Sequence, residues 1–361
     1  MPSASANSAN AAPGDGRGSE LRLRVFGPAS WLFSQVDRES QSLSSLGRAT
    51  LLGVRTERKA PAVVVDGLSK KYGSQTAVDG VSFRVDTGEV FALLGPNGAG
   101  KTSTVEMLEG FRSRDAGTVS VLGIDPSDRS RQRDLRERLG VVLQDLAVEP
   151  FLTVEEVLNR SASYFPAPRD VGEVIRAVGL EEKAKSRVRS LSGGQQRRLD
   201  LGLGIVGNPE LLFLDEPTTG FDPSARRGAW DVVRNLVRGG TTVILTTHYM
   251  DEAEICDRIA IIDGGTIVAS GTPFELKKQY TKDRAYITTT APQALEGLLD
   301  KHGLGYIKKE KYYRADADDI PGLLQVLSEQ KDVITDLEIR KGTLNDVFLE
   351  ITGREIREGD E

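Results

Sequence analysis

The stretch GPNGAGKT, residues 95–102, decides the fold of this 361-residue chain. It matches the pattern G-x-x-x-x-G-K-[ST] at every position, follows the apolar run VFALL (90–94) and precedes a helical pattern. Glycines let such a loop curl until successive N–H groups point at phosphate oxygens, and the helix N-terminus adds its positive dipole end. The stretch therefore predicts a phosphate cradle in a mixed α/β core. The alternative is a Gly-rich turn that merely connects strand and helix.

Two side chains of this loop have predicted roles of their own. Lys101 is expected to reach the β- and γ-phosphates of a nucleotide, and Thr102 to supply a hydroxyl to Mg²⁺. The predicted nucleotide-binding residues of the loop are Gly95, Pro96, Asn97, Gly98, Ala99, Gly100, Lys101, Thr102 and the following Ser103.

A second apolar run, LLFL at 211–214, ends in two acids. Ligands of open α/β sheets bind beyond the carboxyl ends of the strands. Asp215 is therefore placed to hold the Mg²⁺ shell, and Glu216 to polarise an attacking water. Both acids could instead cap the next helix, but beside a matched phosphate loop the chemical interpretation is favoured. The two stretches together predict an ATPase that uses ATP and Mg²⁺.

The string LSGGQ, residues 191–195, resembles the signature motif of the ABC ATPases. Its serine and two glycines suit a helix N-terminus that faces phosphate. An ordinary capped helix would explain Ser192 but not the whole string. In the family this loop faces the γ-phosphate held by the opposite subunit, so the resemblance implies a dimer. The residues implied to act in trans are Ser192, Gly193, Gly194, Gln195 and, in the D-loop-like TGFDP, Asp222.

Other family elements follow in the expected order. Tyr72 resembles the aromatic residue that stacks on adenine, although a buried tyrosine at a strand end would look the same. Gln144 resembles the Q-loop glutamine, which senses Mg²⁺ and water and links to the membrane partner. His248, one of two histidines in the chain, resembles the switch histidine that contacts the γ-phosphate. The resemblance thus implies catalytic roles for Glu216, His248 and Gln144, and Mg²⁺ ligands at Thr102, Gln144 and Asp215.

Changes in composition and in the pattern of apolar residues divide the chain into three predicted parts. Residues 1–60 begin with a Ser-, Ala- and Gly-rich stretch and are predicted to be a disordered extension. Residues 61–280 are predicted to form an α/β nucleotide-binding domain, and the resemblance implies a P-loop NTPase ABC cassette with a RecA-like core, an antiparallel β flank and an α-helical subdomain. Residues 281–361 have a βαββαβ pattern plus a helix, which fits a small α+β ferredoxin-like domain.

Composition excludes several classes of function. The formal net charge is -6, which disfavours the sequence-independent nucleic-acid binding that depends on excess basic residues. No run approaches the ~18–20 apolar residues of a membrane-spanning helix, so a membrane role requires a partner. The single cysteine, Cys256, can form neither an internal disulfide nor a zinc cluster, which favours a reducing cytoplasm.

The segments 248–254 (HYMDEAE), 257–263 (DRIAIID) and 344–349 (LNDVFL) are similar to the type-2 exporter branch of the family, which includes daunorubicin-resistance-type ATP-binding proteins. This resemblance implies the ATP-hydrolysing subunit of an exporter, peripheral at the cytoplasmic face of the cell membrane. It implies two partners, a separate transmembrane permease and a second cassette. The complete motifs permit a homodimer, and whether the pair is this chain twice or two related chains stays open. The resemblance leaves the transported substrate open.

Two alternatives compete with transport. A non-transport ABC ATPase acting on nucleic acid or the ribosome usually has paired cassettes, a long coiled-coil insertion or zinc cysteines, and this sequence shows none of them. A regulatory cassette would bind ATP without turnover, but Glu216 and His248 are both intact. A phosphate-release assay separates the second alternative from an active ATPase.

Overall fold

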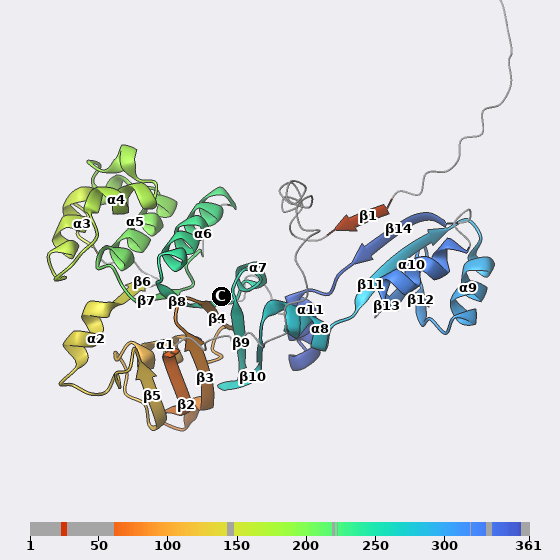
Figure 1. Cartoon of the computed structure of the whole chain (residues 1–361), viewed down its shortest axis with the longest axis horizontal. Coiled ribbons are helices and arrows are strands. Elements are labelled where there is room, and N and C mark those ends of the chain that lie inside the picture. The colour runs from red at the N-terminus through yellow and green to blue at the C-terminus, as the bar shows by residue number, and fades with distance from the viewer. Residues whose placement is uncertain are drawn as a thin grey trace, which may run out of the picture. The chain divides into compact units, whose positions relative to one another are not determined.

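The computed structural model describes residues 23–26, 61–142, 148–218, 221, 223–317, 319–329 and 334–354. Contacts between residues divide the chain into two compact units (Figure 1). The larger unit contains the described residues of 61–281 together with 343–354, and the accessory unit contains 282–342 together with the short strand β1 (Leu23–Phe26). Among the described residues, no helix combines the length and apolar character needed to cross a bilayer.

A six-stranded sheet forms the centre of the larger unit, in the order β10-β9-β4-β8-β7-β6. Its strands are β4 (Val90–Leu94), β6 (Leu139–Val142), β7 (Leu211–Asp215), β8 (Thr242–Thr247), β9 (Arg258–Asp263) and β10 (Thr266–Gly271). All pairings are parallel except that of β9 with β10. Every residue of β4 and β8 is buried, as expected for parallel strands that are covered on both faces. The apolar runs at 90–94 and 211–214 are confirmed as strands.

A three-stranded antiparallel flank covers one side of this sheet. It consists of β2 (Pro61–Tyr72), β3 (Gln75–Asp86) and β5 (Ala116–Val121), in the order β3-β2-β5. One apolar cluster joins Val63 and Val81 of the flank to Phe91 of β4 and Leu108 of helix α1 (Lys101–Leu108). The short helix α2 (Gln132–Arg138) follows the flank in sequence. The flank and α1 thereby fix the loop between β4 and α1.

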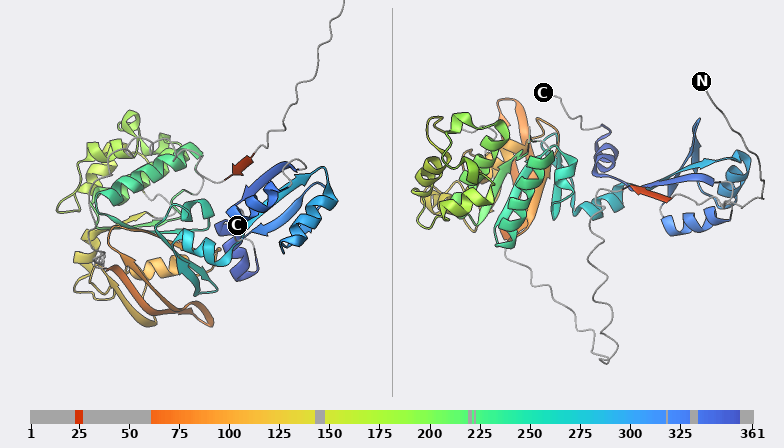
Figure 2. Two further views of the ribbon diagram at one scale, coloured as in Figure 1. Left: turned by 45° about the vertical axis from the view of Figure 1, so that its right-hand side comes forward. Right: turned by 90° about the horizontal axis from the view of Figure 1, so that it is seen from above.

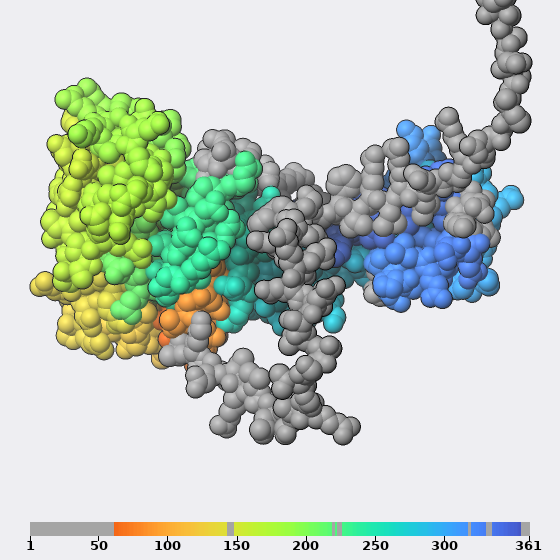
Figure 3. Space-filling model, turned by 45° about the horizontal axis from the view of Figure 1, so that its top comes forward, coloured from red at the N-terminus to blue at the C-terminus, as the bar shows by residue number. Residues whose placement is uncertain are grey.

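A helical subdomain lies on the other side of the central sheet (Figures 1 and 2). It contains α3 (Val154–Ala162), α4 (Val171–Ala177) and α5 (Gly193–Val206), with short 3₁₀ turns at Glu181–Lys183 and Val188–Ser190. Helix α6 (Pro223–Arg238) forms a ridge beside it in the space-filling view (Figure 3). A Cβ at Gly204 of α5 would lie 2.5 Å from the Val142 side chain, so glycine allows this helix to pack closely on β6.

The accessory unit is a five-stranded sheet in the order β1-β14-β11-β13-β12, with two helices. Its remaining elements are β11 (Asp283–Thr289), α9 (Pro292–Lys301), β12 (Tyr306–Lys308), β13 (Tyr313–Ala317), α10 (Ile320–Ser328) and β14 (Ile334–Arg340). Leu295 and Leu299 of α9 and Leu323 of α10 pack on Ile287 and Ala315 of the sheet in a separate apolar core. The predicted βαββαβ order is confirmed. Strand β1 adds to it by pairing in parallel with β14.

The last helix, α11 (Leu344–Thr352), returns to the larger unit. Its residues Leu344, Val347 and Phe348 are buried in the same apolar cluster as Leu276 of α8 (Pro273–Tyr280). The short helix α7 (Met250–Ala253) also contacts α11. Residues 343–354 therefore depart from the predicted span of 281–361, because the apolar face of α11 is buried against the larger unit.

Candidate nucleotide-binding site

The loop between β4 and α1 has the backbone that the glycine pattern predicts. Gly98 and Gly100 have φ angles of 77° and 101°, a region that side chains rarely adopt. A Cβ at Gly100 would lie 2.3 Å from the carbonyl oxygen of Ala77, so no other residue fits there. Gly100 is also the N-cap of α1, and no described side chain caps that end of the helix. The first-turn N–H groups are therefore suited to bind an anion.

Lys101 lies folded against this loop, only 6% exposed. Its Nζ donates to the carbonyl oxygens of Gly95 at 2.8 Å and Pro96 at 3.1 Å, and lies 3.9 Å from Glu216 Oε1. Burial lowers the pKa of the ammonium group, while Glu216 and Asp215 oppose that shift. A buried cation held mainly by carbonyl oxygens is well placed to exchange them for phosphate oxygens.

The two predicted acids lie where β7 and β8 end. Thr246 Oγ1 donates to Asp215 Oδ1, and the Glu216 amide donates to Thr246 O and Oγ1, both at 3.2 Å. Burial raises the pKa of Asp215, and the hydrogen bond from Thr246 partly offsets this. Glu216 has a φ of 47°, which is unusual for a residue with a side chain and marks a strained turn.

That strained turn brings Glu216 to His248. The Glu216 Oε1 and His248 Nδ1 atoms are 3.0 Å apart, and both side chains are nearly buried. The structure thus brings together four of the predicted residues, Lys101, Asp215, Glu216 and His248, around the end of the phosphate loop. A carboxylate that is hydrogen-bonded to an imidazole and lies near a buried lysine can accept a proton from water next to bound phosphate.

The oxygen donors at this site are of the kind that Mg²⁺ prefers. They are the Asp215 carboxylate and the exposed Thr102 hydroxyl. Within the described ranges no three His, Cys, Asp or Glu side chains gather closely enough to hold a metal. The donor set therefore fits an ion that keeps water and phosphate oxygens in its shell, as Mg²⁺ does at nucleotide sites.

Tyr72 ends strand β2 next to the phosphate loop. The side chain is not buried, as the alternative interpretation required, but 39% exposed. Its hydroxyl lies 3.3 Å from Ser103 Oγ, and the Arg112 guanidinium lies 5.2 Å from its ring centroid. An exposed aromatic ring beside a phosphate cradle can stack on a base.

The signature-like string begins helix α5 with a capping box. Ser192 Oγ accepts from the Gln195 amide at 3.3 Å, and Gln195 Oε1 accepts from the Ser192 amide at 3.0 Å. A Cβ at Gly193 or Gly194 would meet no atom of the described residues within 4 Å, so this helix end is open on the glycine side. Two further predicted residues, Gln144 and Asp222, lie outside the described residues.

Sequence reasoning missed Arg197, on the second turn of α5. Its Nη2 donates to the carbonyl oxygens of Asp215 at 2.9 Å and Glu216 at 3.0 Å, and its Nη1 lies 3.2 Å from Asp200 Oδ2. Arg197 thus ties the helix that follows LSGGQ to the turn that carries the two acids. The only signal in the sequence is an arginine three residues before an acid, which is common on helix surfaces.

Sequence reasoning also missed Glu109, directly after α1. The side chain is 4% exposed, and burial, reinforced by the nearby charge of Asp215, raises the pKa of its carboxyl to about 8. A neutral carboxyl next to an ionised one adds no further repulsion at the acid turn.

Comparison with known proteins agrees with this geometry. The family model described as "ABC transporter" matches residues 78–219, and the one described as "ATP-binding protein DrrA1-3-like, C-terminal domain" matches 271–352. The "Nod factor export ATP-binding protein I" of Ralstonia nicotianae is 38% identical over 309 residues, which cover 82% of this chain and 96% of the relative. The "Daunorubicin resistance ATP-binding protein DrrA3" of Streptomyces coeruleorubidus is also 38% identical, over 82% of this chain and 97% of the relative.

Solved structures give the same family. The structure titled "Structure of ATP binding subunit of ABC transporter" matches with a TM-score of 0.56 and 28% identity, over 61% of this chain and 93% of the other. The structure of cbiO1 from Clostridium perfringens matches with a TM-score of 0.55 and 28% identity, over 60% of this chain and 90% of the other. The chain belongs to the family of ABC transporter ATP-binding proteins.

Proposed function

We propose that this chain is the ATP-hydrolysing subunit of an ABC exporter and drives a separate transmembrane permease from the cytoplasmic face of the cell membrane. The observation that carries this proposal is the cluster of Lys101, Asp215, Glu216 and His248 at the end of the phosphate loop. Relatives that align over nearly their whole length and are named for export or drug resistance support the direction of transport.

Nucleotide binding begins at the phosphate loop. The amides of the loop and of the first turn of α1 surround the phosphates, and Lys101 exchanges the Gly95 and Pro96 carbonyl oxygens for β- and γ-phosphate oxygens. Tyr72 stacks on the adenine. Thr102, Asp215 and Gln144 would hold Mg²⁺, which would supply positive charge that neutralises the phosphates.

Hydrolysis uses the strained turn after β7. Glu216 accepts a hydrogen bond from the attacking water and polarises it, and the 3.0 Å contact with His248 Nδ1 fixes the direction of the carboxylate. The other ring nitrogen of His248 remains available for the γ-phosphate. No covalent enzyme intermediate is needed, since positioning and charge stabilisation carry phosphoryl transfer.

The second half of each site comes from a second copy of the chain. Two larger units close around two ATP molecules, and the α5 N-terminus of one copy, with Ser192, Gly193, Gly194 and Gln195, faces the γ-phosphate held by the other. Asp222 acts at the same interface. Closure and reopening push on the permease through the segment 144–165, whose described part contains helix α3.

Glu216→Gln tests the chemistry. The variant should bind ATP without hydrolysing it and form an ATP-dependent dimer in size-exclusion chromatography, whereas Lys101→Ala should bind nucleotide weakly and remain monomeric. Glu210→Gln is a matched control, because Glu210 lies just before the opposite end of β7 and pairs with Arg138. Phosphate release by Glu216→Gln at the wild-type rate would remove Glu216 from its role.

A further inference from the structure

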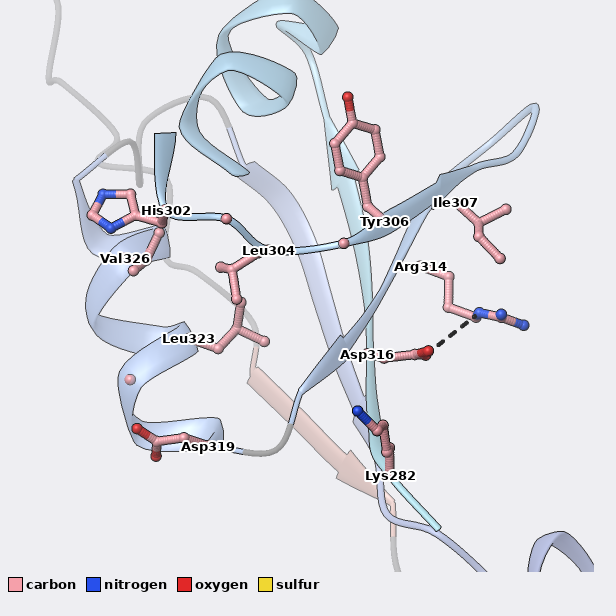
Figure 4. A pocket seen from close by; sticks show the side chains of 13 residues that line it. Lys282, His302, Leu304, Tyr306, Ile307, Arg314, Asp316, Asp319, Leu323 and Val326 are labelled. Atoms are coloured by element: carbon pink, nitrogen blue, oxygen red, sulfur yellow. Dashed lines mark ion pairs between the residues drawn. The ribbon is translucent and has the colours of Figure 1, made fainter. Parts of the chain in front are cut away.

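The accessory unit contains a cavity of about 750 Å³ at the edge of its sheet. It lies between the loop 303–305, strand β13 and helix α10 (Figure 4). The pairing of β12 with β13 ends at Tyr306 and Ala315, so β12 does not cover the edge of β13 from Asp316 onward. A volume of ~300–1,000 Å³ is typical of sites for small organic ligands.

The two sides of this cavity differ in chemistry. Figure 4 shows Leu304, Leu323 and Val326 on one side, and Arg314, Asp316 and Lys282 on the other. The first group is apolar, and the second contains two permanent cations and one carboxylate. His302, which also lines the cavity, lies 3.3 Å from Glu329 and is partnered in this way. Asp319 at the start of α10 is a second carboxylate of the lining, so the cavity as a whole has no net positive charge, but its two cations lie together on the polar side.

Arg314 has hydrogen-bonding capacity that the described residues leave unused. Its Nε atom is buried and has no hydrogen-bond partner there. The nearest acid, Asp316, has its Oδ1 atom 3.9 Å from Nε, which is too long for a hydrogen bond. A buried donor without an acceptor costs free energy, and an acceptor on a ligand would remove that cost.

We propose that this cavity binds a small amphiphilic anion. Its carboxylate or similar acidic head accepts hydrogen bonds from Arg314, whose planar fork suits a two-oxygen group, beside the ammonium group of Lys282. Its apolar body covers Leu304, Leu323 and Val326. The site lies wholly within the accessory unit and is independent of the nucleotide chemistry.

The test uses the full-length chain, with ADP present to fill the nucleotide site. The probe is 11-(dansylamino)undecanoate, whose fluorescence rises in apolar surroundings, with dodecanoate and the uncharged 1-dodecanol as competitors. We expect one saturable site, displaced by dodecanoate at a concentration at least about tenfold lower than by dodecanol. Arg314→Gln should weaken probe binding about tenfold, and Val326→Trp should block it by filling the apolar side.

Lys308→Gln is the matched control, because Lys308 is a cation on β12 that pairs with Glu296 and does not line the cavity. It should bind the probe like the wild type. Circular dichroism and urea unfolding like those of the wild type will show that Arg314→Gln and Val326→Trp keep the accessory unit folded. Wild-type probe binding by these two variants, no saturable binding to the wild-type chain, or equal displacement by dodecanol and dodecanoate would overturn the proposal.

Discussion

Replacing Arg197 by alanine should destabilise the larger unit by about 3–5 kcal/mol. The Arg197 side chain is 11% exposed, and its guanidinium makes two charge-assisted hydrogen bonds shorter than 3.1 Å, to the carbonyl oxygens of Asp215 and Glu216. Each such bond contributes about 1.5–3 kcal/mol. A second estimate gives a similar total. The variant removes a positive charge from beside the nearly buried Asp200, and breaking a buried ion pair from one side costs about 3–5 kcal/mol.

Urea unfolding followed by tryptophan fluorescence measures this loss, because Trp230 is buried in α6 of the same unit. With an m-value of about 3 kcal/mol per molar urea, the midpoint should fall by about 1–1.7 M. Arg197→Lys keeps the positive charge but not the planar guanidinium, so its free energy of unfolding should fall by about half as much. Arg198→Ala is the neighbouring control. It removes a single bond to the Gly179 carbonyl oxygen that is exposed to water, so it should cost less, about 0.5–1.5 kcal/mol. A loss below about 1 kcal/mol in Arg197→Ala would refute the energetic role assigned to this contact.

Three further predictions concern burial and backbone strain. Because burial places the pKa of Glu109 at about 8, above its ordinary 4.5, the contribution of Glu109 to stability should be fully present below pH 4.5 and be lost as the pH rises through 8. Glu109→Gln should abolish that decline in urea melts recorded in EDTA, and an unchanged pH profile would contradict it. Gly100→Ala should lower the melting temperature and ATP affinity more than Gly98→Ala, because both positions have positive φ but only Gly100 would also clash, and equal losses would contradict this. Phe348→Ala should cost about 3–5 kcal/mol, against less than about 0.5 kcal/mol for the exposed Leu349→Ala, and urea melts of the larger unit will show whether the two differ.

The sequence predicts the phosphate loop and the acid turn well, because their chemistry depends on local order. Gly98 and Gly100 are required by backbone geometry, and the acids Asp215 and Glu216 follow directly from a buried strand. The contacts of Arg197 could not be predicted, since its partners are backbone carbonyl oxygens some twenty residues away. Every residue has such a carbonyl, so the sequence does not indicate which one is bound. The roles assigned to all of these site residues stay predictions, and Gln144 and Asp222 also lie outside the described residues.

The position of α11 shows a second limit of sequence reasoning. Its apolar residues Leu344, Val347 and Phe348 predict a helix with one buried face, but such spacing does not say which surface covers that face. Because short strands and helices of the accessory unit precede it in sequence, α11 was predicted to belong to that unit. Its apolar face is instead buried in the same cluster as Leu276 of the larger unit.

Because the chain returns in this way, residues 282–342 of the accessory unit form an insertion within the sequence of the larger unit and not a C-terminal extension of it. Entry and exit are adjacent, since Arg284 pairs with Arg340 and the Gly342 amide donates to Asp283 Oδ1 at 3.1 Å. Truncation after residue 281 would remove residues 282–342 and also the buried Leu344, Val347 and Phe348, which belong to the core of the larger unit. Removal of the accessory unit without this loss requires an internal excision that joins Thr281 to Thr343 through a few glycines, together with deletion of strand β1.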